Sequence, residues 1–146
     1  MLPFLIISRE LDLVRDLLAV TVLSLVACST YGTIVKNFKN AGYVEVDLEE
    51  SNEATAKLLV AETEKGNLSC DIHLLQLKEN DWLSYNAVIL EFSSDEALTE
   101  ALDDNATLKG LVTDAQKTKL VHGNCILIPL SLIKADDMID LFNEGK

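Results

Sequence analysis

The sequence predicts a single domain of the α+β class, and three observations support this prediction. The chain has 146 residues, which suits one domain with one hydrophobic core. Hydrophobic residues make up 49% of it and charged residues 25%, as is typical of a folded chain. Residues 43–50 alternate between apolar and acidic side chains like a half-buried strand, and segments with the helical period lie on both sides of them.

A helix, a strand and a second helix are expected first. The first helix covers residues 34–41 and ends at Gly42, a residue suited to a helix terminus. Its apolar face consists of Ile34, Phe38 and Ala41. The strand of residues 43–50 directs its acidic residues outward, and its inward residues are Val44, Val46 and Leu48. The second helix covers residues 54–65.

Two strands and two helical segments follow. Residues 68–78 and 85–92 are predicted to form an antiparallel hairpin, because both are rich in strand-forming residues and a short polar stretch joins them. The next helix is expected to start at Ser93, with Glu96 completing a capping box. A second helical segment begins after the polar residues 103–105.

The last part of the domain combines a hairpin and a helix. Gly123 and Asn124 suit a two-residue turn between strands at residues 119–122 and 125–129. Pro129 marks a strand end or a sheet edge, since proline cannot donate to a strand ladder. Asp136 is expected to cap the final helix.

From residue 44 to residue 128 the predicted order is strand, helix, strand, strand, helix, strand. This order resembles the ferredoxin-like fold. The resemblance implies one antiparallel sheet with helices on one face, here with further helices flanking it at both termini. Many unrelated functions share this order, so the resemblance indicates no activity.

The charge of the chain restricts its partners. Twenty-four acidic residues against 12 lysines and arginines give a net charge of −12, a field that repels phosphate backbones. No basic cluster offsets this field, so nucleic acid is excluded as a partner. The sequence also lacks a glycine-rich phosphate loop and a recognisable nucleophile motif. We therefore predict a protein that is not an enzyme and holds no cofactor.

Residues 17–27 form an almost uninterrupted apolar run that ends directly before Cys28. Crossing a bilayer takes about 20 apolar residues, and the charged residues upstream prevent a longer span. The run has the length of the apolar centre of a secretory signal. A core helix is the alternative, although a run that is apolar on nearly every face is unusual in a small domain.

The end of this run, Leu25-Val26-Ala27-Cys28, resembles the lipobox of bacterial lipoproteins. The resemblance implies that residues 1–27 are a cleaved signal peptide and that the thiol of Cys28 carries a diacylglycerol. Residues 28–32 would then be a lipidated tether and residues 33–146 the domain. The leader contains acidic residues where lipoproteins have a basic segment, and we explain this by a miscalled start, with residues 1–12 not translated.

The resemblance to lipoproteins implies a protein of the bacterial cell envelope, anchored to a membrane through lipid and facing outward. Together with the missing catalytic motifs, it predicts an acidic domain that binds a protein or peptide partner. The alternative is a cytosolic, ferredoxin-like domain that dimerises through its sheet. Such a dimer would bind or transform a small molecule in a pocket between the sheet and the helices.

Two aromatic residues of the predicted hairpin connection, Trp82 and Tyr85, are the candidate binding residues. A surface tryptophan can anchor a partner. The favoured interpretation is that Trp82 instead folds back and covers one end of the sheet.

A zinc site is the one metal centre that the sequence suggests. Its four residues are of types that bind zinc: Cys70, His73, His122 and Cys125. The first pair has the pattern C-x-x-H, and the second pair has the reverse pattern, H-x-x-C. The turn brings His122 and Cys125 together, whereas Cys70 and His73 point to opposite faces of a strand. The favoured interpretation is a buried Cys125 and a half-exposed His73. A disulfide between Cys70 and Cys125 is a further alternative, although the ferredoxin-like order places their strands at opposite edges.

Overall fold

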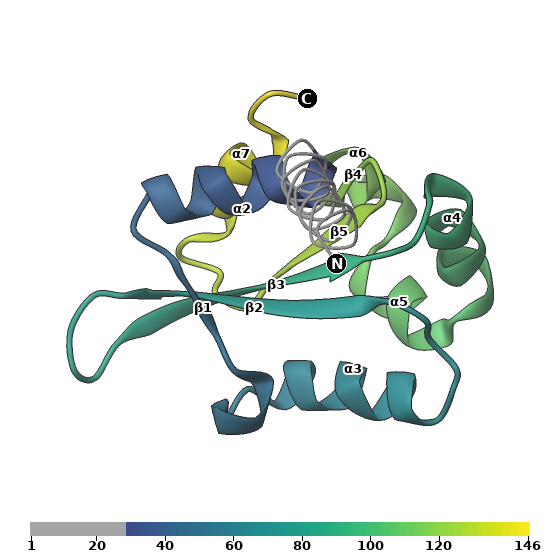
Figure 1. The fold of residues 1–146 in the computed structure, drawn as a ribbon, viewed down its shortest axis with the longest axis horizontal. Coiled ribbons are helices and arrows are strands. Elements are labelled where there is room, and N and C mark those ends of the chain that lie inside the picture. Colours follow the sequence, from purple (N-terminus) through teal and green to yellow (C-terminus); the bar gives the residue numbers. More distant parts are fainter. Residues whose placement is uncertain (1–28) are drawn as a thin grey trace, which may run out of the picture.

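The structure is a computed structural model, and it describes residues 29–146. The predicted signal peptide and the predicted lipid site, Cys28, lie outside these residues. The strands are β1 (Val44–Val46), β2 (Asp71–Lys78), β3 (Ser84–Glu91), β4 (Val121–His122) and β5 (Cys125–Pro129). They form one sheet in the order β1-β2-β3-β5-β4, and every neighbouring pair is antiparallel (Figure 1).

Helices cover both faces of this sheet. They are α2 (Thr30–Asn40), α3 (Ala54–Glu64), α4 (Asp95–Asp104), α5 (Ala106–Leu111), α6 (Lys117–Leu120) and α7 (Ala135–Asn143). Short 3-10 turns span Leu48–Glu50 and Asp114–Gln116. Helices α2 and α7 lie together over one face, whereas α3 runs across the opposite face (Figure 1). Asn37 joins α2 to α7 by donating from Nδ2 to the carbonyl oxygen of Leu141 at 3.1 Å.

The predicted α+β class, with its antiparallel sheet and flanking helices, is confirmed. Two ferredoxin-like expectations are wrong. The helices lie on both faces of the sheet and not on one (Figure 1), and the strand order differs from the ferredoxin-like order, in which the third strand separates the first two. Here β1 pairs directly with β2, with Val44 opposite Gln76. The three residues of β1 form one short ladder at the edge of the β2–β3 hairpin. Val44 is consequently 55% exposed, not buried as its alternation predicts.

Several predicted boundaries are wrong by a few residues. Helix α2 starts at Thr30 and not at residue 34, β2 starts at Asp71 and not at residue 68, and the strand predicted over residues 43–50 is shortened to β1, with a 3-10 turn over Leu48–Glu50. Ser94 caps α4 in place of Ser93, and its hydroxyl accepts the backbone N–H of Ala97 at 3.1 Å. Residues 117–120 form α6, so the strand expected from residue 119 starts only at Val121.

The carboxyl-terminal hairpin is confirmed, since Gly123 adopts a φ of +58° and His122 pairs with Cys125 across the turn. The predicted cap of the last helix is wrong. Helix α7 starts after Lys134 without a side-chain cap, and Asp136 lies in its first turn. There a carboxylate still favours the helix through the helix dipole.

The sheet has two ends with different neighbours. At the end that we call the tip end, residues 79–83 connect β2 to β3 and residues 130–134 connect β5 to α7. At the turn end, the β4–β5 turn meets the start of α2, where a Cβ on Gly123 would lie 2.9 Å from Oγ1 of Thr30. The strand β3 separates the two ends by roughly 25 Å.

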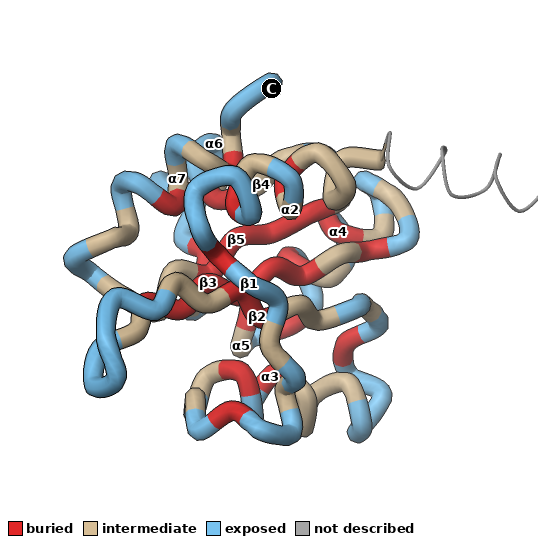
Figure 2. Tube along the Cα trace, turned by 60° about the vertical axis from the view of Figure 1, so that its left-hand side comes forward, coloured by how far each residue is buried: buried red, intermediate tan, exposed pale blue. Residues whose placement is uncertain are grey.

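The core lies on both faces of the sheet, and the buried residues follow the strands and the helix sides that face them (Figure 2). Strand β3 is buried at all six of its internal positions, as a central strand between two helical layers should be. In the part of the chain that the structure describes, no helix is both long and apolar enough to cross a membrane.

Candidate functional site

Helix α2 starts immediately after the predicted lipid site. Ser29 caps the helix, because its Oγ accepts the backbone N–H of Gly32 at 3.0 Å. Residues 30–32 of the predicted tether are therefore helical, and Ser29 alone separates Cys28 from the helix.

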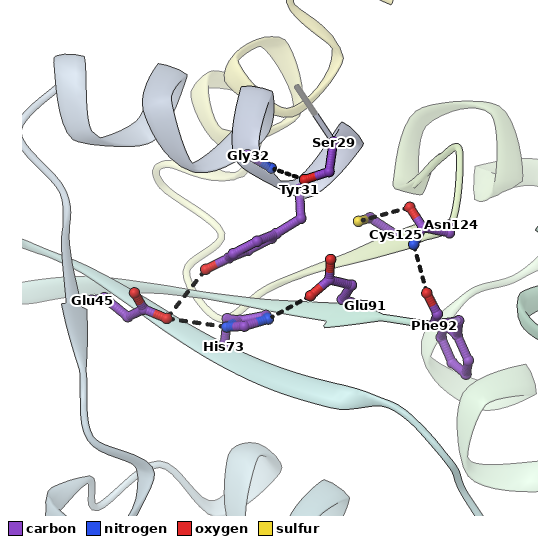
Figure 3. Close-up of polar contacts among 9 residues, drawn as sticks. All are labelled: Ser29, Tyr31, Gly32, Glu45, His73, Glu91, Phe92, Asn124 and Cys125. Atoms are coloured by element: carbon purple, nitrogen blue, oxygen red, sulfur yellow. Dashed lines mark hydrogen bonds and ion pairs between the residues drawn. The ribbon is translucent and has the colours of Figure 1, made fainter. Parts of the chain in front are cut away.

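Four side chains meet at the start of α2, and we call them the His73 cluster: Tyr31, Glu45, His73 and Glu91 (Figure 3). Nδ1 of His73 is 3.1 Å from Oε1 of Glu45, and Nε2 is 3.2 Å from Oε1 of Glu91. The ring of Tyr31 stacks on the imidazole, with 3.9 Å between the centroids, and its hydroxyl donates to Glu45 at 3.2 Å. The cluster joins α2 to β1, β2 and β3.

The register of the sheet assembles this cluster. His73 is opposite Ile89 on β3, two residues from Glu91, so both side chains lie on the face that α2 covers. Glu45 on β1 is opposite Leu75, again two residues from His73. Sequence reasoning missed the cluster because it directed Glu45 into solvent. A lone histidine among the apolar residues of β2 was the only available signal.

The His73 cluster has the chemistry of a structural link between helix α2 and the sheet. Each ring nitrogen of His73 lies within hydrogen-bonding distance of one carboxylate, Nδ1 of Glu45 and Nε2 of Glu91, so the imidazole links two strands on either side of β2. Burial, followed by the negative charge of Glu45, raises the pKa of Tyr31, so its hydroxyl remains a donor. Burial also raises the pKa of the nearby Cys125 thiol to about 12, which makes it a poor nucleophile at neutral pH.

The residues of the predicted zinc set do not converge on one point. His122 and Cys125 are cross-strand partners, but Nδ1 of His122 is 2.8 Å from the carbonyl oxygen of Phe142. Within residues 29–146, no three His, Cys, Asp or Glu side chains form a group that could hold a metal ion. Cys70 and Cys125 are free thiols, so the alternative of a disulfide is wrong. Cys125 is fully buried, as the favoured interpretation predicts, and the side chain of His73 is 19% exposed.

A shallow cleft of 430 Å³ opens beside the His73 cluster at the turn end. Glu91 belongs to both the cluster and the cleft, and Cys70 and Asp71 contribute a further part of its lining. Burial, followed by the charge of Asp71, raises the pKa of the Cys70 thiol to about 12. The cleft is therefore acidic and contains no activated thiol.

The β2–β3 hairpin presents Trp82 to solvent. Trp82 is 94% exposed, so the favoured interpretation that it covers the end of the sheet is wrong. The reason is the side chain of Asn80, whose Oδ1 accepts the backbone N–H groups of Trp82 and Leu83, both at 2.9 Å. This local turn fixes the loop and directs the indole away from the sheet.

Tyr85, the second candidate binding residue, is buried instead and is only 7% exposed. Its hydroxyl donates to Oε2 of Glu79, and this hydrogen bond raises the pKa of Tyr85. The ammonium of Lys134 lies over its ring, 5.6 Å from the centroid. Tyr85 thus supports the two loops of the tip end and offers little surface to a partner.

Three further apolar residues are exposed at the tip end, and one of them, Leu83, directly follows Trp82 and is 42% exposed. Leu132 and Ile133 are 97% and 80% exposed, in the loop that ends at Lys134. We call the three most exposed of these residues the apolar tip: Trp82, Leu132 and Ile133. Sequence reasoning missed the second loop because two apolar residues between a strand and a helix carry no periodic signal.

Comparison with known proteins gives no match to a family model, a curated protein or a solved structure. The function is therefore inferred from the residues and geometry of the chain itself.

Proposed function

We propose that this chain is a lipid-anchored protein of the bacterial cell envelope whose acidic domain binds a protein or peptide partner through the apolar tip. One observation supports this most: Trp82 is 94% exposed on a braced hairpin, at the end of the sheet opposite the start of α2. Tryptophan is among the residues that contribute most to binding interfaces. Three large apolar side chains exposed on two loops at the same end of the sheet fit a contact surface.

The proposed lipid anchor would act through the start of α2. With Ser29 alone between Cys28 and the helix, a lipid on Cys28 would hold the turn end of the sheet close to the membrane. The His73 cluster fastens the same end of α2 to three strands, so the helix and the sheet keep one orientation. The apolar tip would then face away from the membrane, toward a partner.

A cytosolic dimer that joins its sheets and acts on a small molecule has less support. Within residues 29–146, helices lie over both faces of the sheet, so a second copy would meet helices and not an open sheet face (Figure 1). The 430 Å³ cleft lies at one end of the sheet, and its thiol, Cys70, has a raised pKa.

Radioactive palmitate fed to the producing bacterium tests the anchor. The wild-type protein should be labelled and sediment with membranes, and Cys28→Ser should lose both properties. Cys70→Ser is the matched control, because it removes a half-buried thiol of the domain and should keep the label. An unlabelled wild-type protein in the soluble fraction would overturn the anchor.

Photo-crosslinking in intact cells tests the partner. A photoreactive amino acid at Ile133 should capture one discrete partner, and the additional change Trp82→Ala should abolish the capture. The same amino acid at Leu58, which is 48% exposed on α3, should capture none. Capture at Ile133 that persists without the indole would contradict the proposed surface.

A further inference from the structure

A second cleft, of 340 Å³, lies at the tip end between the end of α2, the end of β2 and α7. Its apolar wall consists of Ala41, Leu77 and Leu141. Its charged rim consists of Lys134, Asp137 and Asp140, all at or in α7. Lys134 directly follows Ile133, so the cleft adjoins the apolar tip.

The cleft is also lined by Tyr43, whose hydroxyl is the one buried side-chain polar atom without a hydrogen-bond partner in residues 29–146. Tyr43 is 3% exposed, and its ring meets that of Phe38 edge-on with 5.0 Å between the centroids. Leaving a buried hydroxyl unpaired is unfavourable, because the group has lost its hydrogen bonds to water. Burial, followed by the charge of Asp137, raises the pKa of Tyr43, so the group is a neutral hydroxyl beside a carboxylate of the same cleft.

The two carboxylates of the rim are not equivalent. Asp137 is paired within its own helix, with Oδ2 at 3.5 Å from Nζ of Lys134. Asp140 lies one helical turn further on the same side and makes no ion pair with any residue that the structure describes. An unpaired carboxylate and an unpaired hydroxyl therefore border one apolar wall.

We propose that this cleft binds an arginine or lysine side chain from a basic, apolar segment of the partner. The aliphatic stem of such a side chain would cover the apolar wall, and its cationic head would donate to Asp140. A small movement of the cleft lining would expose the buried oxygen of Tyr43, which would then accept a second hydrogen bond from the head. Neighbouring apolar residues of the segment would contact Trp82 and Ile133. This inference rests on the proposed function, because it states the chemistry of that partner.

Other ligand classes fit this cleft less well. An anion would meet two carboxylates on the rim, and a purely apolar group would leave the Tyr43 hydroxyl unpaired. A basic segment is also favoured at long range, because the chain carries a net charge of −12 and attracts cations.

Fluorescence anisotropy with the full chain in mild detergent tests the inference. The probe is a short, labelled, amidated peptide of alternating leucine and arginine, and the comparison peptide has neutral citrulline in place of arginine. Asp140→Asn should weaken binding of the arginine peptide about tenfold, the loss expected for one charge-assisted hydrogen bond. Asp136→Asn makes the same charge change on an exposed residue of α7 outside the cleft and should change binding less than about twofold.

The substitution Tyr43→Phe tests whether the Tyr43 hydroxyl binds the ligand or stabilises the fold. It should weaken binding about threefold to tenfold while leaving the free energy of unfolding unchanged or higher, because the deleted hydroxyl has no internal partner. Equal effects of the two Asp→Asn changes, equal binding of the citrulline peptide, or a marked loss of stability in Tyr43→Phe would each overturn the inference.

The crosslinking experiment at Ile133 distinguishes this inference from the proposed function. If capture requires Trp82 but is unaffected by Asp140→Asn, the inference that the cleft binds a basic side chain is overturned. The proposed function then still stands. Peptide binding that requires Asp140, without any capture at Ile133 in cells, leaves the cleft standing and overturns the proposed function.

Discussion

The ring of Tyr31 lies nearly flat on the imidazole of His73, with 3.9 Å between the centroids and 18° between the planes. Glu45 contacts both residues, since its Oε1 accepts from the Tyr31 hydroxyl and lies 3.1 Å from Nδ1 of His73. The first turn of α2 is therefore held to the sheet by specific side chains and not only by its apolar face.

Removing the Tyr31 ring should destabilise the domain. We expect Tyr31→Ala to lower the free energy of unfolding by about 2 kcal/mol, because it removes a partly buried ring and the stacking of that ring on His73. Tyr31→Phe keeps the stack and loses one exposed hydrogen bond, so about 0.5 kcal/mol is expected. Urea denaturation followed by circular dichroism measures both values, and equal losses would show that stacking contributes nothing.

A side chain at Gly123 should separate α2 from the β4–β5 turn. Gly123→Ala forces a φ of +58° on alanine and places its Cβ 2.9 Å from Oγ1 of Thr30. Gly66→Ala is the control, because its φ is +75° and its Cβ would meet nothing within 4 Å. The control should cost about 1–2 kcal/mol of stability, and Gly123→Ala should cost at least about 1 kcal/mol more. Equal costs would mean that the contact with Thr30 is easily relieved.

The domain thiols should react slowly while the protein is folded. Burial raises the pKa of both Cys70 and Cys125 to about 12, so few thiolates exist at pH 8. In a Cys28→Ser background, a chromogenic disulfide reagent should modify neither residue until urea is added. Fast modification of the native protein would show that one thiol is exposed and ionised.

The same pKa shift predicts a loss of stability at high pH. The ordinary thiol pKa is 9.0, and that of folded Cys125 is about 12. Above pH 9.0 the unfolded chain releases the proton while the folded chain keeps it, so the free energy of unfolding falls between these two values and is fully retained below pH 9.0. The slope from Cys125 is at most about 1.4 kcal/mol per pH unit. Urea titrations at pH 8 and pH 10 should show a smaller fall in Cys125→Ala than in the wild type.

Trp82 is the single tryptophan of the chain and therefore reports its own exposure. Native fluorescence should resemble that of free tryptophan, be quenched fully by acrylamide, and shift little on unfolding. Trp82→Ala should leave the free energy of unfolding within about 0.5 kcal/mol of the wild type. A blue-shifted native emission would instead indicate that the indole is covered.

Local signals predicted most of the elements. The alternation of the strands, the glycine after α2 and the Gly123–Asn124 turn act within a few residues, so they can be recognised in a single sequence. Strand order was harder, because it depends on which edge accepts the three residues of β1. Val44 shows the difference: its alternation indicates a strand correctly, but its burial depends on a neighbour far along the chain.

The candidate surfaces depend even more on distant contacts. Trp82 could be identified as a surface aromatic, but its direction is set by Asn80, whose side chain can cap a turn in several ways. Tyr43 gave no signal, because a tyrosine beside a glycine is ordinary until its hydroxyl is found without a partner. The His73 cluster combines four separate elements, and their distances follow only from the register of the sheet.

The opposite placement of the α2 start and the apolar tip has a mechanical consequence. A partner that pulls on the tip while the other end is fixed to a membrane would load the domain along β3 and its neighbours. The hydrogen bonds of an antiparallel sheet run perpendicular to the strands, so such a force would shear many of them together and not peel them one by one. The domain would then transmit tension as a stiff link.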